Sequence, residues 1–141
     1  MTPARGLFVT GTDTGVGKTL VACALVRELR RRGHDVGAMK PVETGVGTEG
    51  PLDARALRAA AGDGDPLELV CPERFSLPAA PTAAARRAGR EVSLEAIGRA
   101  FRTLSERHAL LIVEGAGGLL VPLNAKTTMA DLARALRLPL L

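Results

Sequence analysis

The sequence predicts an α/β protein in which a parallel sheet carries helices on both faces. Short apolar runs without polar alternation, typical of strands buried on both sides, alternate along the chain with segments of helical periodicity. Glycine-rich turns separate the two kinds of segment, as in right-handed strand–helix–strand units. With 141 residues and 46% hydrophobic content, the chain has the size of one domain with a substantial core.

In the first half of the chain, residues 6–10 read as a buried strand, and residues 18–32 read as a helix that ends at Gly33, a suitable C′ glycine. A second strand is predicted from His34 to Met39, before Pro41. A short helix follows at 53–61, and a turn at 62–66.

In the second half, residues 67–92 look irregular apart from a helix at about 82–88, because prolines recur there. Ser93 can cap a helix that runs to about Arg107. The remaining predicted elements are a buried strand at 109–113, a helix capped by Thr128 with Asp131 and running to Arg137, and a further strand that begins at Pro139.

The segment 11–19, Gly-Thr-Asp-Thr-Gly-Val-Gly-Lys-Thr, stands between the first strand and the first helix. This order is typical of a loop that cradles phosphates with backbone N–H groups at a helix N-terminus. Lys18 would neutralise the β- and γ-phosphates, the Thr19 hydroxyl would ligate Mg²⁺, and the amides of Thr19 and Leu20 would hold the α-phosphate. Gly15, Val16 and Gly17 form the turn, where glycine lets the backbone approach the phosphates. A P-loop NTPase-like fold is therefore expected.

The spacing of this loop departs from the usual pattern, which has four residues between its first glycine and the Gly-Lys pair. Here five residues separate Gly11 from Gly17. The alternative interpretation is a chance glycine turn before a helix.

A second glycine-rich segment follows the strand at 109–113, which leads directly into Glu114. An acid at the end of a buried strand is typical of nucleotide-binding proteins that place a carboxylate beside Mg²⁺. The next residues, Gly115, Ala116, Gly117 and Gly118, would let the backbone come close to phosphates. The alternative is a solvated glutamate at a strand end, followed by a glycine turn.

Lys40 follows the second strand, so its ammonium group is expected at the same sheet edge as Lys18. Two ammonium groups around a transferring phosphoryl group would stabilise its developing charge. Thr44 offers a hydroxyl to a substrate. Taken alone, Lys40 could equally be a surface lysine, and Asp53 is better explained as a helix N-cap. His34 and His108 lack metal-ligand spacing and are expected to be structural.

Composition argues against several classes of partner. The net charge is +4, but the arginines are spread over several predicted helices, and aromatic residues make up 2% with no Trp or Tyr. Stacking on nucleic-acid bases is therefore not expected, and nucleic acid is not an expected partner. Cys23 and Cys71 lack CxxC spacing, which fits a reducing cytoplasm. No signal peptide or membrane span is predicted, so a membrane is not an expected partner either.

Three segments together resemble the dethiobiotin synthetase family: residues 9–19, residues 40–45 (Lys-Pro-Val-Glu-Thr-Gly) and residues 113–118 (Val-Glu-Gly-Ala-Gly-Gly). The phosphate loop of that family carries the same extra residue, and the resemblance covers the whole chain. It implies a single P-loop ATP-binding synthetase domain over residues 1–141, forming the N-terminal portion of a longer family domain.

The resemblance also implies roles for residues. Lys18 and the loop amides would bind the phosphates of ATP, and Gly115–Gly118 would lie near phosphate or carbamate. Lys40 would be the catalytic lysine, and Thr44 would contact the substrate. The Mg²⁺ ligands would be Thr19, Asp53 and Glu114.

The implied reaction closes a ring. One amine of 7,8-diaminononanoate takes up CO₂, ATP phosphorylates the carbamate, and the second amine displaces phosphate to give dethiobiotin in biotin biosynthesis. The family works as a cytoplasmic homodimer with an active site across the subunit interface. Because a fourth core strand is only beginning where the chain stops, we expect a piece of a longer protein or a truncated gene product, possessing phosphate and Mg²⁺ sites but not necessarily turnover.

Three alternatives stay open. A partition-type nucleotide-switch ATPase would carry a lysine five residues before the lysine of the Gly-Lys pair, where this chain has Asp13. A related P-loop amidating synthase would usually carry a glutamine-amidotransferase domain, and no sequence for one is seen. The third alternative is a degenerate domain without activity.

Overall fold

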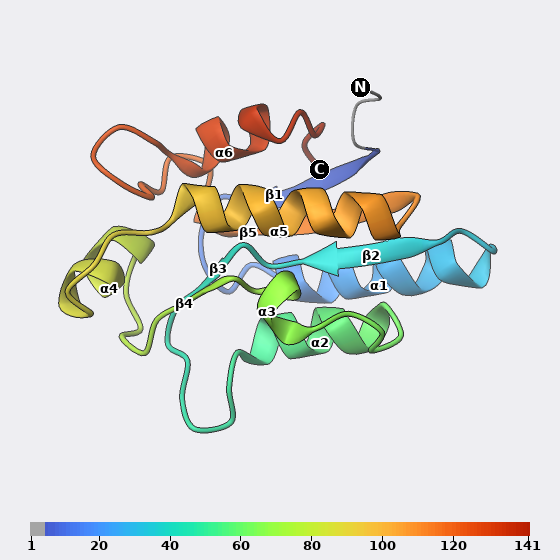
Figure 1. The fold of residues 1–141 in the computed structure, drawn as a ribbon, viewed down its shortest axis with the longest axis horizontal. Helices are drawn as coiled ribbons and strands as arrows, with labels where there is room; N and C mark the ends of the chain where they lie inside the picture. The colour runs from blue at the N-terminus through green and yellow to red at the C-terminus, as the bar shows by residue number, and fades with distance from the viewer. Residues whose placement is uncertain (1–4) are drawn as a thin grey trace.

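The main sheet has three parallel strands in the order β1 (Gly6–Gly11), β5 (Leu110–Gly118) and β2 (Val36–Met39) (Figure 1). This computed structural model describes residues 5–141. In the register, Phe8 lies opposite Val113, and Met39 lies opposite Val113 on the other side of β5. The predicted α/β class with a parallel sheet is confirmed.

Residues 139–141 add backbone pairing on the free side of β1. The Phe8 amide donates to the Pro139 carbonyl over 2.8 Å, and the Leu141 amide donates to the Phe8 carbonyl over 2.9 Å. The bridge between Phe8 and Leu140 is parallel. The predicted beginning of a fourth strand is therefore present, next to β1.

Helices pack on both faces of the sheet because side chains along each strand alternate between them. On one face, Val9, Ile112 and Ala38 pack against α1 (Lys18–Arg31) and α2 (Leu52–Ala60). On the other face, Phe8 and Val113 pack against α5 (Leu94–Arg107) and α6 (Met129–Ala135). In the orientation of Figure 1, α5 lies in front of the sheet and α1 behind it.

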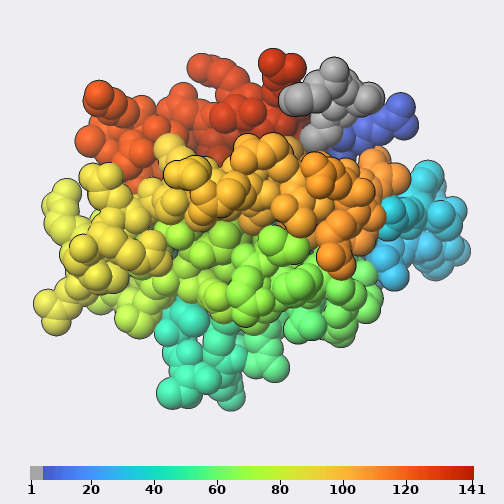
Figure 2. Space-filling model, in the orientation of Figure 1, coloured from blue at the N-terminus to red at the C-terminus, as the bar shows by residue number. Residues whose placement is uncertain are grey.

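A second, smaller sheet lies beside the first. Its strands, β3 (Val42–Glu43) and β4 (Glu73–Arg74), pair in parallel. The short helices α3 (Leu67–Val70) and α4 (Pro81–Arg87) flank β4 in the chain. The exposed loop between β3 and α2 projects at the lower edge of the molecule, and α5 forms a band across its middle (Figure 2).

The predicted elements correspond to observed ones, with bounds that differ by a few residues. The prediction that residues 67–92 are irregular apart from one helix is in part wrong, because this segment contains α3 and β4 as well as the predicted α4. The caps of α5 and α6 are confirmed: Ser93 accepts from the Ala96 amide, and Thr128 with Asp131 forms a capping box. Gly33 has the positive φ, 90°, of a C′ glycine.

The largest difference concerns the predicted strand end at Val113. Strand β5 continues through Gly118, and Glu114 pairs with Val9 in the middle of β5. After a register shift, Gly118 lies opposite Gly11 at the start of the phosphate loop. A Cβ on Gly118 would come within 3.1 Å of the Thr12 carbonyl oxygen, so the absence of side chains lets the two segments pair closely.

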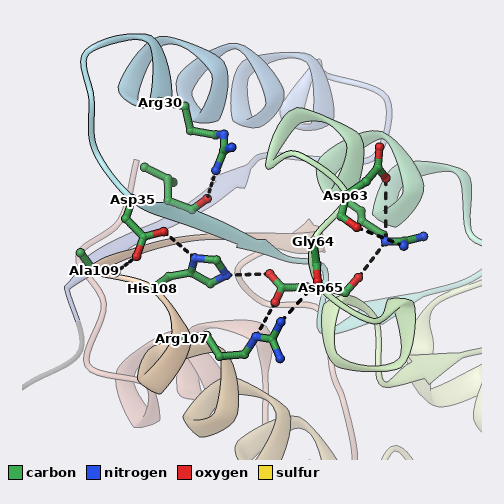
Figure 3. A network of polar contacts seen from close by, with 10 residues as sticks. Arg30, Asp35, Asp63, Gly64, Asp65, Arg107, His108 and Ala109 are labelled. Carbon is green, nitrogen blue, oxygen red and sulfur yellow. Dashed lines mark hydrogen bonds and ion pairs between the residues drawn. The ribbon is translucent and has the colours of Figure 1, made fainter.

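At the opposite edge of the sheet, His108 joins three segments (Figure 3). Its Nδ1 lies 2.8 Å from Asp35 Oδ1, and its Nε2 lies 2.7 Å from Asp65 Oδ2. Arg107 also contacts Asp65, at 2.7 Å. A Cβ on Gly37 would come within 2.5 Å of the imidazole ring, which explains why glycine stands there. The expected structural role of His108 fits these contacts.

Candidate nucleotide and metal site

A cleft of about 440 Å³ opens where β1 and β2 end, beside the second half of β5. The phosphate loop forms one wall, and the segments after β2 and within β5 form the others. The lining residues are Thr14, Gly15, Gly17, Lys18, Thr19, Leu20, Lys40, Glu43, Thr44, Asp53, Glu114, Ala116 and Gly117. The structure thus brings together residues from all three segments that sequence analysis singled out.

The phosphate loop requires glycine for its backbone conformation. Gly15 has φ 74° and Gly17 has φ 102°, values that L side chains rarely adopt. A Cβ at either position would meet no atom within 4 Å, so backbone conformation and not space is the constraint. Val16, between them, is half exposed and is not among the lining residues.

The N-terminus of α1 presents backbone hydrogen-bond donors without a side-chain cap. Gly17 is its N-cap and provides no side-chain cap, and the first turn holds no acidic residue. The first amides of a helix have no partner within the helix, so those of Lys18, Thr19 and Leu20 can bind an anion. In contrast, the first turns of α2, α5 and α6 each hold an acid.

Lys18 lies at the mouth of the loop with its Nζ 2.6 Å from the Asp13 carbonyl oxygen. Burial lowers the pKa of Lys18, and the nearby charge of Lys40 lowers it further. Two ammonium groups sharing one cleft repel each other, and a polyanion would remove that repulsion. The charge arrangement therefore favours phosphate.

Glu114 lines the cleft and is almost fully buried. Its Oε1 accepts a hydrogen bond from the Thr19 hydroxyl over 2.7 Å and from Lys40 Nζ over 2.9 Å. Lys40 also donates to the Gly115 carbonyl over 3.0 Å and lies 3.6 Å from Asp53 Oδ2. The Lys40 side chain is 5% exposed, so it is a buried counterion of the Glu114 carboxylate and also lies within ion-pair distance of the more exposed Asp53.

The oxygens around Lys40 fit a magnesium ion. The Thr19 hydroxyl and the carboxylates of Asp53 and Glu114 are the hard oxygen ligands that Mg²⁺ prefers. Glu114 Oε2 is buried without a hydrogen-bond partner within the described range 5–141. Nowhere in residues 5–141 do three or more His, Cys, Asp or Glu side chains form a cluster that could hold a metal by itself. Because Mg²⁺ usually keeps waters and takes phosphate oxygens, two carboxylates and a hydroxyl suffice.

Gly115 faces away from the cleft. It is absent from the lining, and a Cβ there would lie 2.8 Å from the Phe8 ring. Its carbonyl nevertheless fixes Lys40. Ala116, Gly117 and Thr44 do line the cleft.

The interpretation of Asp53 as an N-cap is wrong. Helix α2 begins at Leu52 with Pro51 as its N-cap, and Asp53 lies in its first turn. Proline has no side-chain acceptor, and the Asp53 and Ala54 amides instead donate to the carboxylate of Glu43, a residue for which no role was predicted. The sequence feature that could have indicated a distant cap is Pro51, because a proline at the N-cap leaves the start of α2 without a local side-chain acceptor.

Both cysteines are buried and unpaired. Burial raises the pKa of the Cys71 thiol to about 12, and it also raises that of Cys23. Cys23 packs among the apolar residues of α1 and the sheet, as expected. Along residues 5–141, no helix combines the length and apolarity needed to cross a bilayer.

The family model described as AAA domain matches residues 5–141. The chain belongs to this family. The fold class predicted from the phosphate loop, a P-loop NTPase-like sheet with helices on both faces, is thereby confirmed.

Curated relatives support the more specific resemblance. The chain is 61% identical over 137 residues to a protein of Anaeromyxobacter dehalogenans (strain 2CP-C) named ATP-dependent dethiobiotin synthetase BioD, covering 97% of this chain and 61% of the relative. Proteins of the same name from Aquifex aeolicus (strain VF5) and Bacillus licheniformis are 47% and 44% identical, each covering 96% of this chain and 60% and 58% of the relative. The resemblance to dethiobiotin synthetases is confirmed, and the chain spans about 60% of the length of these relatives.

Proposed function

We propose that this chain is the nucleotide-binding portion of an ATP-dependent dethiobiotin synthetase, an enzyme that closes 7,8-diaminononanoate with CO₂ into a cyclic urea. The observation that carries the proposal is the cleft in which Lys18, Lys40 and Glu114, from three separate segments, lie together. The names of the relatives favour this reaction over a partition-type ATPase or an amidating synthase.

In this proposal ATP binds by its phosphates at the phosphate loop. The loop backbone at Gly15, Val16 and Gly17 and the amides of Thr19 and Leu20 surround the phosphates, and Lys18 offsets their charge. The uncapped N-terminus of α1 supports this role, since its donors have no side-chain acceptor.

Thr19, Asp53 and Glu114 would hold Mg²⁺, and the orphaned Glu114 Oε2 supports this assignment. When bound, Mg²⁺ neutralises phosphate charge and polarises the phosphoryl group. Lys40 would then turn from the carboxylates towards the substrate, with its ammonium group free to donate to a carbamate and to the γ-phosphate. Ala116 and Gly117 would lie near the same groups, Gly115 would act through its carbonyl on Lys40, and Thr44 would contact the diamine.

The chemistry explains why a phosphoryl donor is needed. One amine adds to CO₂ and loses a proton, which gives a carbamate whose oxygen is a poor leaving group. The γ-phosphoryl group passes from ATP to that oxygen, releasing ADP. The second amine then attacks the carbonyl carbon, loses a proton and expels phosphate as the ring closes. Lys40 and Lys18 stabilise negative charge throughout, and the cleft holds the reacting groups together.

The proposal includes a homodimer in the cytoplasm, as the resemblance implies. It also keeps residues 1–141 as one ATP-binding domain that forms the N-terminal portion of a longer protein. The relatives support the last point through their greater length.

Product formation tests the proposal. The chain is incubated with 7,8-diaminononanoate, ¹³C-bicarbonate and Mg-ATP, and mass spectrometry is used to detect dethiobiotin one mass unit heavier than the unlabelled compound. Lys40→Ala is expected to form product roughly 10²- to 10³-fold more slowly, because a donor to the transition state is lost.

Unlabelled or undetectable product from a chain that still binds Mg-ATP would contradict synthetase activity for residues 1–141. ATP hydrolysis that proceeds equally without diamine and bicarbonate would favour the nucleotide-switch alternative.

A further inference from the structure

Glu43 lines the cleft and accepts hydrogen bonds from the first turn of α2. Its Oε1 accepts the Asp53 amide over 2.9 Å, and its Oε2 accepts the Ala54 amide over 2.9 Å. Pro51, the N-cap of this helix, makes no side-chain cap. A carboxylate on strand β3 therefore accepts hydrogen bonds from two amides that the side chain of an N-cap residue would otherwise satisfy.

The backbone that carries Glu43 is held by the neighbouring segment. The Phe75 amide donates to the Glu43 carbonyl over 2.9 Å, and the Lys40 amide donates to the Val70 carbonyl over 2.8 Å. In the small sheet, Glu43 lies opposite Arg74. Glu43 is 7% exposed, so its carboxylate is fixed both by its strand and by burial.

The side chain of Asp53 is less firmly fixed than that of Glu43, because it is 46% exposed. Across residues 5–141, the charged group within ion-pair distance of that carboxylate is Lys40, at 3.6 Å. The position of the Asp53 carboxylate therefore depends on where the start of α2 is held. Glu43 holds it there through the Asp53 amide itself.

We propose that Glu43 is a positioning residue that sets the place of the Asp53 carboxylate and thereby the affinity of the cleft for Mg²⁺ in the presence of nucleotide. The inference rests on the proposed function, in which Asp53 is a metal ligand. Groups that orient metal ligands typically contribute 10- to 100-fold to metal affinity when they are hydrogen-bonded to them.

The energetics explain why both amides are needed. Burial raises the pKa of Glu43, while the hydrogen bonds from Ala54 and Asp53 lower it. The buried carboxylate would be costly without these donors, and the donors would be unsatisfied without the carboxylate. The positive end of the α2 dipole also favours a carboxylate there.

The test compares Glu43→Gln with a matched control, Glu73→Gln. Glu73 is also a buried glutamate of the small sheet, and its Oε2 accepts the Ser93 amide at the start of α5. Glu73 does not line the cleft. For each variant, ATP affinity is measured by isothermal titration in Mg²⁺ and in EDTA, and the ratio of the two dissociation constants reports metal coupling.

We expect Glu43→Gln to reduce this ratio about tenfold or more, because a Gln amide points N–H groups at a backbone donor. The change in its ATP affinity in EDTA should be smaller than the change in this ratio, and Glu73→Gln should keep the ratio of the unmodified chain. In an Asp53→Ala background, Glu43→Gln should have no further effect on the ratio, since the ligand it positions is gone.

A rescue distinguishes positioning from direct contact. Pro51→Ser supplies a local N-cap oxygen at the start of α2. Combined with Glu43→Gln, it should restore folding where that is lost and return most of the metal coupling. Hydrogen exchange at the Asp53 and Ala54 amides should be faster in Glu43→Gln and slower again in the double variant.

The inference is overturned if Glu43→Gln exchanges faster at these amides and yet keeps the full ratio. It is also overturned if the loss persists in the Asp53→Ala background, or if Pro51→Ser restores slow exchange without restoring coupling. A ratio of one in the unmodified chain would remove the proposed metal site itself, and the inference with it. The measurement on the unmodified chain therefore separates the two failures.

Discussion

Lys40 and Glu114 form an ion pair inside the protein, with 5% and 1% of their side chains exposed. Such a pair adds little to stability over an apolar pair, because removing two charges from water costs as much as their attraction returns. Its retention fits a site where Lys40 is the counterion of Glu114 until another cation and a phosphate arrive. The Thr19 hydroxyl shares the same Glu114 oxygen.

Breaking this pair should strongly destabilise the ligand-free protein. Lys40→Met leaves the Glu114 charge buried and unpaired, so we expect the free energy of unfolding to fall by about 3–5 kcal/mol. The double variant Lys40→Met/Glu114→Leu should cost less than the sum of the two single variants. Urea unfolding in EDTA measures all three.

Arg32→Ala provides the control for this prediction. Arg32 pairs with Glu28 on the surface, where water screens the interaction, and its removal should change stability little. A Lys40→Met variant as stable as Arg32→Ala would contradict the account of Lys40 as a buried counterion.

The candidate residues whose environments are local were predictable from the sequence. Gly17, Lys18 and Thr19 follow one another between a strand and a helix, so their order along the chain indicates them although the spacing from Gly11 is one residue longer than usual. Glu43 was not predictable, because its partners lie 10 and 11 residues further along and on another element. Sequence spacing does not encode which strand will face the start of a helix that has no cap of its own.

The elements differ in how their ends are determined. The capped starts of α5 and α6 were predictable from Ser93, Thr128 and Asp131, since a cap is a local interaction. The end of β5 was not, because pairing with β1 carries the strand beyond Val113 through four residues without large side chains. That extension brings Gly118 against the phosphate loop and leaves Glu114 within the strand.

His108 connects the end of α5 with the starts of β2 and α3 through two carboxylates (Figure 3). Burial acts to lower the pKa of His108, but the hydrogen bonds and charges of Asp35 and Asp65 outweigh it, and the net pKa is raised above 6.5. The hydrogen bond with His108 lowers the pKa of Asp35 in return. The network thus favours the imidazolium form.

The stability of the protein should therefore depend on pH through His108. Because the pKa of His108 is higher in the folded than in the unfolded protein, its protonation adds to the free energy of unfolding. This contribution is fully present below the pKa of the unfolded protein, near 6.5, and is lost as pH rises through the pKa of the folded protein. We expect His108→Gln to be most destabilising at pH 5.5–6.5, with the difference from the unmodified chain shrinking at higher pH. Urea unfolding across pH 5.5–9 measures this difference. A difference that is constant over the range would contradict a charged His108.

In the molecule as a whole, the phosphate loop, the segment after β2 and the second half of β5 meet at one edge of a parallel sheet, where α/β proteins usually bind ligands. Topology makes this meeting predictable, because parallel strands end at a common edge. The fold class, the sheet and the cleft could thus be inferred from the sequence. The small sheet of β3 and β4 could not, because its strands are two residues each and pair across 29 intervening residues of loops and helices.

Mg²⁺ and ATP are expected to bind together in the cleft formed by Lys18, Lys40 and Glu114. The decisive experiment is isothermal titration of ATP into the 141-residue chain, with Mg²⁺ and with EDTA. We expect saturable binding of one ATP per chain that is at least about tenfold tighter with Mg²⁺. The absence of binding, or equal affinity with and without the metal, would contradict the account.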